Sequence, residues 1–271
     1  METPKLAIIL SVYAKDSVLF VTEAVGSILR QTVTDFDLFI REDGPLDPSL
    51  ETYLLTVQDK RVHCYQRDEN KGLAHSLNDL LAIVLPLGYQ YIARMDADDV
   101  CAPNRLERQL QYLELHPEVD CAGTWAIEIL SDGTEFFRKR MPEHHDDCLQ
   151  LFRKRDCLIH PTVMFRRSFF EKAGIYETDT FFAEDTMMWA KGFAAGCRFA
   201  NVPDFLYKFR LDSIFFERRR GWKHAKGILE VRKRVNKMLG FGLKEELYAY
   251  MYAFVKMLPT PILRIIYKTF R

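Results

Sequence analysis

The sequence predicts an α/β protein with a Rossmann-like, mostly parallel central sheet flanked by helices and followed by a helical tail. Apolar segments of strand length alternate with helical patterns through about the first 118 residues, which is typical of successive βαβ units. Polar loops follow three of the predicted strands. Residues 217–271 are basic and lack this alternation. With 271 residues, 48% of them hydrophobic, the chain can bury a large core.

The elements of the first half follow from the spacing of apolar residues. The predicted strands cover residues 6–12, 37–42, 62–66 and 89–95, and the predicted helices cover residues 21–31, 48–57, 73–84 and 102–116. Parallel sheets of this kind bind ligands outside the carboxyl ends of their strands. The loops YAKDS, EDGP and DADDVCAP follow the first, second and fourth strands. We therefore expect their polar residues to converge on one cleft.

The pattern changes after residue 119. Two extended runs joined by Ser131, Asp132 and Gly133 predict a hairpin, and helices are predicted at 168–176 and 183–196. No internal repeat or low-complexity linker divides the chain. We expect one domain over residues 1–216 and a helical tail over residues 217–271.

Composition excludes several classes of protein. The formal net charge is zero, yet residues 217–271 carry 14 Lys and Arg against 4 Asp and Glu, a balance of +10, and residues 1–216 carry −10. Six scattered cysteines without a C-x-x-C pair argue against a zinc ribbon and favour reduced thiols in a cytoplasmic protein. The N-terminus leads directly into a strand pattern rather than a secretory signal, and no apolar run approaches the ~20 residues of a membrane span.

The segment ARMDADDVCAP places Asp96, Asp98 and Asp99 within four positions, directly after a predicted strand. Capping of the helix begun by Pro103 needs only one carboxylate. Three carboxylates so close together repel one another unless a cation lies among them. Mg²⁺ and Mn²⁺ prefer oxygen ligands and commonly bind phosphate oxygens as well. The cluster therefore predicts a metal-bound diphosphate, with helix capping as the alternative.

Two common nucleotide-binding motifs are missing from the sequence. It contains neither G-x-G-x-x-G nor G-x-x-x-x-G-K-[ST], and the loop after the first predicted strand has no glycine. Lys and Arg side chains together with the metal would then have to neutralise the phosphates.

The order of these segments resembles that of inverting, GT-A-fold glycosyltransferases of the large family 2 type, which make bacterial polysaccharides. The resemblance covers about residues 5–215 and rests on LSVYAKD, FIREDG, ENKGLAHSLN, DADD, HPTVMFRR and AEDTMMW. It implies a catalytic domain over residues 1–216, with a nucleotide-binding half of about 1–118 and an acceptor half of about 119–216.

The resemblance also implies roles for individual residues. The positions that match the nucleotide-sugar site of the family are Val12, Tyr13, Glu42, Asp43, Asn70, Lys71, Gly72 and Asp96. Asp98 falls on the metal ligand of the D-x-D motif, with Asp96 also near the Mg²⁺ or Mn²⁺. Asp185 falls on the general base, whereas a pair of first-turn helix acids is the alternative for Glu184 and Asp185.

Three further positions carry open alternatives. The family often has Y-R-x-H after its last strand, whereas this chain has Arg210 in place of the histidine, and arginine can neutralise phosphate but cannot bind a metal. His160, Glu184 and Trp189 belong to the acceptor-side segments. A structural histidine and a core aromatic are the alternatives for His160 and Trp189. The HHDD segment at 144–147 is expected to begin a solvated helix.

The tail is predicted to contact an anionic membrane surface. Residues 218–237 hold nine Lys and Arg and one acid, and residues 248–271 mix aromatic and aliphatic side chains with four Lys and Arg. Docking on the catalytic domain through Tyr248, Tyr252, Phe254 and Leu258 is the alternative. Nucleic acid is disfavoured as a partner because the body of the protein is acidic.

Together these features predict a metal-dependent inverting hexosyltransferase, peripheral on the inner face of the plasma membrane. It would move a hexose from a nucleotide diphosphate sugar, expected to be a UDP-sugar, to a saccharide or lipid-linked saccharide acceptor in cell-surface polysaccharide synthesis. The alternatives are a sugar-phosphate nucleotidyltransferase and a non-catalytic carbohydrate-binding or scaffold subunit of a membrane complex.

Overall fold

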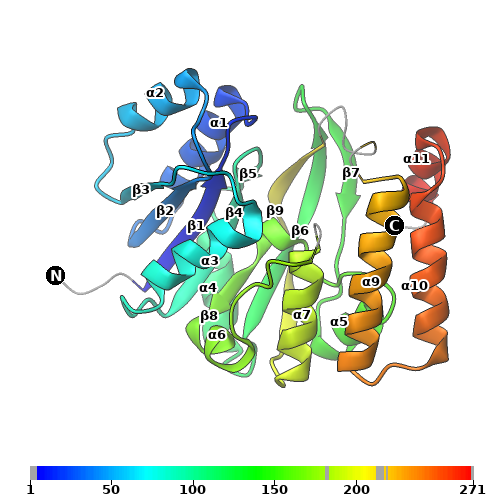
Figure 1. Ribbon diagram of the computed structural model, residues 1–271. Coiled ribbons are helices and arrows are strands. Elements are labelled where there is room, and N and C mark those ends of the chain that lie inside the picture. Colours follow the sequence, from blue (N-terminus) through cyan, green and yellow to red (C-terminus); the bar gives the residue numbers. More distant parts are fainter. Residues whose placement is uncertain (1–4, 181–182, 212–216, 218, 270–271) are drawn as a thin grey trace.

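The computed structural model describes residues 5–180, 183–211, 217 and 219–269. These residues form one nine-stranded sheet with helices on both faces, and a group of C-terminal helices packs at one side (Figure 1). The strand order is β3-β2-β1-β4-β8-β6-β9-β5, with β7 paired to β6. The predicted α/β class is confirmed.

The first half is a parallel βαβ series. Its strands are β1 (Leu6–Val12), β2 (Phe36–Glu42), β3 (Val62–Gln66) and β4 (Tyr91–Asp96), and its helices are α1 (Val18–Leu29), α2 (Pro48–Thr56) and α3 (Leu73–Val84). All four predicted strands and the three helices between them are confirmed. β2 and β3 lie on one side of β1, and β4 lies on the other side. The direction in which successive strands are added to the sheet therefore reverses at β1. Ligands of α/β proteins bind at such switch points.

The second half extends the same sheet with two long strands that pair in parallel with each other and with shorter strands that pair antiparallel. Its elements are β5 (Val100–Cys101), α4 (Arg105–Leu115), β6 (Cys121–Leu130), β7 (Glu135–Lys139), α5 (His145–Phe152), the 3₁₀ helix η1 (His160–Thr162), β8 (Met164–Arg166), α6 (Arg167–Ala173), α7 (Glu184–Ala194) and β9 (Phe199–Leu211). The predicted hairpin joins β6 and β7, with Gly133 at a φ of +85°. The strands β5 and β8 have only two and three residues, too few for a detectable periodicity.

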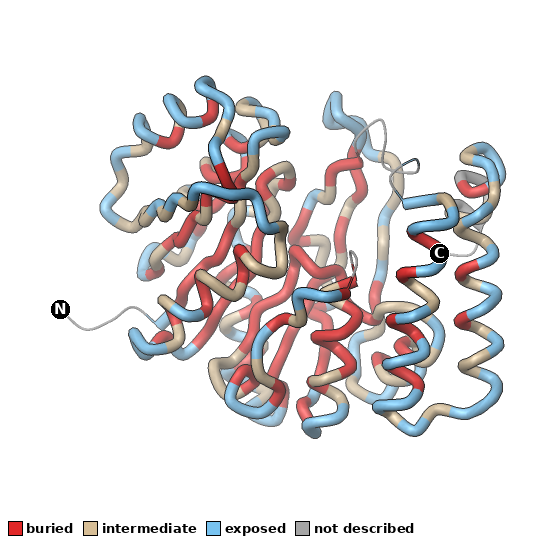
Figure 2. Tube along the Cα trace, viewed as in Figure 1, coloured by how far each residue is buried: buried red, intermediate tan, exposed pale blue. Residues whose placement is uncertain are grey.

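The sheet separates two apolar cores. One core packs the face covered by α3, α6 and α7, and the other packs the face covered by α1, α2 and α4. Figure 2 shows the central strands buried along most of their length, whereas β3 and β7 are partly exposed. The rigid sheet therefore fixes the positions of the loops that leave its edges.

In the described part of the tail, residues 219–269 contain the helices α9 (Trp222–Met238), α10 (Leu243–Lys256) and α11 (Thr260–Thr269). Val231 and Val235 of α9 belong to the core on the α7 face, and Arg232 of α9 is 5% exposed. Burying a valine side chain contributes about 1.5–3 kcal/mol. Helix α9 is thus part of the folded core, whereas the residues expected to dock the tail were Tyr248, Tyr252, Phe254 and Leu258. Phe254, one of the expected docking residues, is instead 63% exposed.

The six cysteines are free thiols, and five of them are buried. Among the residues that the structure describes, no helix combines the length and the apolar character that crossing a bilayer requires.

Candidate active site

The carboxyl ends of β1, β2 and β4 lie side by side at one edge of the sheet. Ser11 of β1 pairs with Asp96 of β4, and Val12 of β1 pairs with Glu42 of β2. Because neighbouring strands lie about 4.8 Å apart, the loops after β2 and β4 leave the sheet roughly 10 Å from each other. These loops converge as the sequence predicts.

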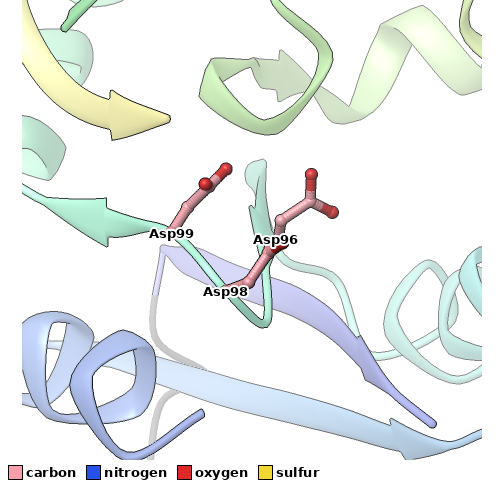
Figure 3. Close-up of side chains that lie close together, drawn as sticks. All are labelled: Asp96, Asp98 and Asp99. Atoms are coloured by element: carbon pink, nitrogen blue, oxygen red, sulfur yellow. The ribbon is translucent and has the colours of Figure 1, made fainter. Parts of the chain in front are cut away.

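The loop between β4 and β5 carries the acidic cluster of Asp96, Asp98 and Asp99 (Figure 3). One carboxylate oxygen from each residue lies within 4.8 Å of the others. The buried guanidinium of Arg94 pairs with Asp96, with Nη1 donating to Oδ2 at 3.1 Å. The helix α4 begins at Arg105 after Asn104, without a side-chain cap, so capping does not explain the cluster.

Asp99 is the most constrained member of this cluster. Its side chain is fully buried, and its Oδ1 accepts the backbone N–H of Arg210 at 2.7 Å. Its Oδ2 has no hydrogen-bond partner among the residues that the structure describes. Burial raises the pKa of Asp99 well above its ordinary value, and the charges of Asp98 and Asp96 raise it further.

Arg210 holds the acidic loop rather than facing open space. Its Nε donates to the carbonyl oxygen of Asp98 at 2.8 Å, and its Nη2 pairs with Glu23 at 2.5 Å. Its guanidinium also stacks on Phe20, 4.0 Å from the ring centre. The side chain is only 4% exposed. In this structure Arg210 therefore positions the acidic loop, and the expectation that it neutralises phosphate directly is not supported.

Asp43 is the anchor of the loop before α3. Its carboxylate accepts the backbone N–H groups of Lys71 at 2.8 Å and Gly72 at 2.9 Å, and it pairs with the buried guanidinium of Arg67. The side-chain amide of Asn70 donates to the Asp43 carbonyl at 3.0 Å. With all these partners and a side chain 4% exposed, Asp43 fixes the loop before α3 and does not offer a free carboxylate to a ligand.

The other residues predicted to bind the nucleotide sugar differ in their solvent exposure. Val12 and Glu42 are buried, Tyr13 and Gly72 are half-buried, and Asn70 and Lys71 are exposed. Burial raises the pKa of Glu42. An open depression of about 440 Å³ lies beside the end of β2, and Glu42, Glu51, Cys64 and Gln66 are among its lining residues. Tyr13, Asn70 and Lys71 thus remain accessible for direct contact with a nucleotide.

The first turn of α7 brings two more acids toward the acidic loop. Burial raises the pKa of Glu184, while the charges of Arg94 and Asp96 also act on it. Burial, together with the charges of Asp156 and Glu184, raises the pKa of Asp185 to about 7. A carboxylate with such a pKa can exchange a proton near neutral pH.

His160 and Trp189 lie in the core beneath this turn. His160 Nε2 lies 3.0 Å from the hydroxyl of Tyr176, and burial lowers the pKa of the imidazole well below its ordinary value. Trp189 is fully buried and packs edge to face on Phe199. Their rings present no surface to an acceptor, so both take the structural alternative instead of the expected acceptor-side role.

Comparison with known proteins identifies the family. The sequence profile described as Glycosyl transferase family 2 matches residues 7–174, more than half of the chain. The chain is a family 2 glycosyltransferase. The amylovoran biosynthesis glycosyltransferase AmsE of Erwinia amylovora is 29% identical over 97% of both chains.

Two further similarities bear on the glycosyltransferase. The UDP-Gal:alpha-D-GlcNAc-diphosphoundecaprenol beta-1,3-galactosyltransferase of Escherichia coli is 26% identical over 98% of this chain and 96% of its own. The mannosyltransferase PcManGT of Pyrobaculum calidifontis, in complex with GDP-Man and Mn²⁺, superposes with a TM-score of 0.65 over 98% of this chain and 80% of its own, at 16% identity. This last likeness confirms the GT-A fold.

The acidic cluster of this glycosyltransferase fits a divalent metal. Three carboxylates supply hard oxygen ligands, and the buried Oδ2 of Asp99 lacks a partner among the described residues. The repulsion that raises the pKa of Asp99 disappears when a cation lies among the carboxylates. The residues present therefore suit Mg²⁺ or Mn²⁺.

Sequence reasoning missed the arginines that support the site. Arg67 and Arg94 are both nearly fully buried and each pairs with a predicted site acid, Asp43 and Asp96 respectively. Arg94 lies two positions before Asp96 in β4, so both side chains project to one face of the strand. That spacing was the available signal for Arg94, whereas the pairing of Arg67 depends on the loop conformation.

Proposed function

We propose that this glycosyltransferase moves a hexose from a UDP-sugar to a lipid-linked saccharide in cell-surface polysaccharide synthesis, with inversion at the anomeric carbon. The observation that carries the proposal is the electrostatic link between two acidic sets, the Asp96–Asp98–Asp99 cluster after β4 and the Glu184–Asp185 pair at the start of α7. The charge of Asp96 acts on Glu184, and the charge of Glu184 acts on Asp185. The first set suits the departing diphosphate and the second suits the attacking hydroxyl.

Asp98 and Asp96 would hold Mg²⁺ or Mn²⁺ at the diphosphate. A bound divalent ion supplies Lewis-acid stabilisation of the charge on the leaving group. Lys71, exposed on the loop that Asp43 anchors, adds a positive charge at the same edge of the sheet. Tyr13 and Asn70 would contact the nucleoside.

Asp185 would remove the proton from the acceptor hydroxyl as that oxygen attacks the anomeric carbon from the face opposite the diphosphate. Displacement from the opposite face inverts the anomeric configuration. Its pKa of about 7 suits a general base at neutral pH. Glu184, which interacts electrostatically with both Asp96 and Asp185, would orient the acceptor.

The substrates are proposed from the relatives. The galactosyltransferase of Escherichia coli is named for a UDP-sugar donor and a diphosphoundecaprenol-linked acceptor, and AmsE is named for polysaccharide biosynthesis. Family membership disfavours a nucleotidyltransferase or a non-catalytic scaffold subunit. A lipid-linked acceptor also requires the enzyme to work at the cytoplasmic surface of the membrane.

A thermal-shift panel of sugar nucleotides tests the donor class. A ligand at 100 times its dissociation constant stabilises the folded state by about 2.7 kcal/mol, which corresponds to a rise of about 5–10 °C in Tm for a chain of this size. We expect this rise with a UDP-hexose and Mn²⁺ together, and a much smaller one when Mn²⁺ is omitted. A larger rise with GDP-mannose would reassign the donor, and pyrophosphate release from UTP plus a sugar phosphate would favour a nucleotidyltransferase.

The outer face of α10 is proposed as the membrane contact. Its exposed apolar residues recur at helical spacing, so they lie on one side of the helix: Leu243, Leu247, Tyr250, Met251, Phe254 and Met257. Lys233 of α9 lies 4.7 Å from the Tyr250 ring, which brings the cations of α9 beside this face. An apolar face with flanking lysines suits the surface of an anionic bilayer.

The double substitution L247E/F254E is expected to reduce sedimentation with anionic liposomes at least tenfold, because it places two charges in the apolar face. Leu55→Glu is the matched control, since Leu55 is 74% exposed on α2, compared with 70% for Leu247. Truncation of the tail is unsuitable because α9 supplies core residues. Unchanged sedimentation of the double variant would remove this face as the anchor, and a dimer that liposomes do not disrupt would assign it to a second copy of the chain.

A further inference from the structure

An ion pair between Arg232 of the C-terminal helix α9 and Asp156 is linked by hydrogen bonds to Asp185, the acid that we propose as the base. Arg232 of α9 donates from Nη2 to Oδ1 of Asp156 at 3.1 Å and from Nη1 to the carbonyl oxygen of Phe152 at 3.0 Å. Its side chain is 6% exposed and also packs on the Phe152 ring. Arg232 is therefore fixed by a salt bridge, a main-chain carbonyl and an aromatic ring.

Asp156 is in turn hydrogen-bonded to the first turn of α7. Its Oδ1 also accepts the hydroxyl of Thr186 at 2.8 Å, and the backbone N–H of Thr186 donates to Oδ1 of Asp185 at 2.7 Å. The hydrogen bonds run without a gap from Arg232 through Asp156 and Thr186 to Asp185. A movement of Asp156 would change both the position of Thr186 and the electrostatic potential at the Asp185 carboxylate.

Charges from several elements surround Asp185. Asp156 and Glu184 disfavour its ionised form, whereas Arg219 favours it. Asp185 and Asp156 also act on Lys139 of β7, whose pKa burial lowers to about 8, and Asp185 acts on Tyr176. Among the surrounding charges, Asp156 opposes ionisation of Asp185 most strongly. Arg232 of α9 is the ion-pair partner of Asp156. The ion pair therefore limits how strongly Asp156 repels a charge on Asp185.

We infer that Asp156 and Arg232 are positioning residues that set the protonation of Asp185, so that α9 is a working part of the active site. This inference rests on the proposed role of Asp185. Neither residue needs to touch a substrate, since each acts through the next member of the chain of hydrogen bonds. The family profile matches residues 7–174, so it assigns nothing to Arg232.

The two ends of the ion pair should shift the pH dependence of turnover in opposite directions. Asp156→Asn removes a negative charge beside Asp185 while keeping an oxygen for Thr186 and Arg232, so the acid limb of the kcat profile should move to lower pH by about one unit. Arg232→Gln leaves Asp156 uncompensated, so the limb should move to higher pH by a similar amount. The double variant D156N/R232Q should return close to the wild-type profile.

A purely structural role would give a different pattern. Loss of packing lowers Tm and the kcat plateau in both variants but leaves the midpoint of the limb in place. Lys237→Gln, an exposed charge removal on α9, is the control and should shift neither Tm nor the limb. If Arg232→Gln does not fold, Arg232→Lys keeps the charge and should retain the wild-type limb, while Asp156→Asn still tests the opposite shift.

The experiment separates failure of this inference from failure of the proposed function. If Asp185→Asn abolishes turnover but the acid limb of Asp156→Asn and Arg232→Gln stays at the wild-type pH, the positioning role is wrong and the base remains. If Asp185→Asn retains full turnover, the base assignment is wrong and the inference falls with it.

Discussion

Turnover of Asp185→Asn is expected to fall by about 10²–10⁴-fold while affinity for the sugar nucleotide is unchanged, because an amide cannot accept the hydroxyl proton. Asp185 lies in the first turn of α7, where an acid can also serve only to stabilise the positive end of the helix dipole. That alternative predicts a loss of at most about 1 kcal/mol of stability and no specific loss of turnover. Measuring kcat and Tm of the same variant separates the two roles.

The pH profile of the wild-type enzyme provides a second measurement for Asp185. Burial and neighbouring acids raise its pKa to about 7, so protonation increases as the pH falls below 7. Only the deprotonated carboxylate can act as a base, and turnover should therefore fall about tenfold per pH unit on the acid side. Below pH 7 the rate decreases, and above pH 8 it should be nearly constant until another group titrates.

Asp147→Asn is the matched control for both measurements. Asp147 is an exposed acid in the first turn of α5, so its replacement removes the same favourable helix-dipole interaction without touching the proposed site. Its kcat should equal that of the wild type. Equal turnover in Asp185→Asn and Asp147→Asn would show that Asp185 is only a first-turn acid.

How well the sequence predicts each element depends on how far apart in the sequence the residues that stabilise it lie. β1 to β4 and α1 to α3 form from local periodicity, which a single sequence contains in full. The hairpin of β6 and β7 has a turn signal at Gly133. The antiparallel β8 has three residues and is held by β4 and β6, which are distant in the sequence. No local pattern indicates it.

The candidate site shows the same division. The spacing of Asp96, Asp98 and Asp99 predicted a cluster at the carboxyl edge of the sheet, and the cluster lies there. The partners of Asp43 and of Arg210 come from loops and strands remote in the sequence, and these partners decide whether each side chain faces a ligand or holds a loop. From its residue type, Arg210 was expected to neutralise the charge of a phosphate. Its tertiary contacts with Asp98 and Glu23 show instead that it holds the acidic loop in position.

Asp98→Asn is expected to reduce turnover by at least about 10²-fold and to abolish the thermal stabilisation by Mn²⁺, because the site loses a charged oxygen ligand for the metal at the diphosphate. EDTA should reduce the turnover of the wild type to a similar level, and added Mn²⁺ should restore it. Asp68→Asn, at an exposed acid in the loop before α3, is the control and should retain both turnover and the Mn²⁺ response.

Without metal, Asp98→Asn is expected to raise the melting temperature, whereas with Mn²⁺ it is expected to lower the melting temperature relative to the wild type. In the wild type the carboxylates of Asp96, Asp98 and Asp99 lie close together, and after burial the charges of Asp98 and Asp96 are the next causes that raise the pKa of Asp99. Removing one charge relieves this repulsion, so the metal-free variant should melt at a higher temperature than the metal-free wild type. With Mn²⁺ the order should reverse, because binding to the folded state then stabilises only the wild type. A variant that melts lower than the wild type in both conditions would indicate that Asp98 supports the loop and does not bind the metal.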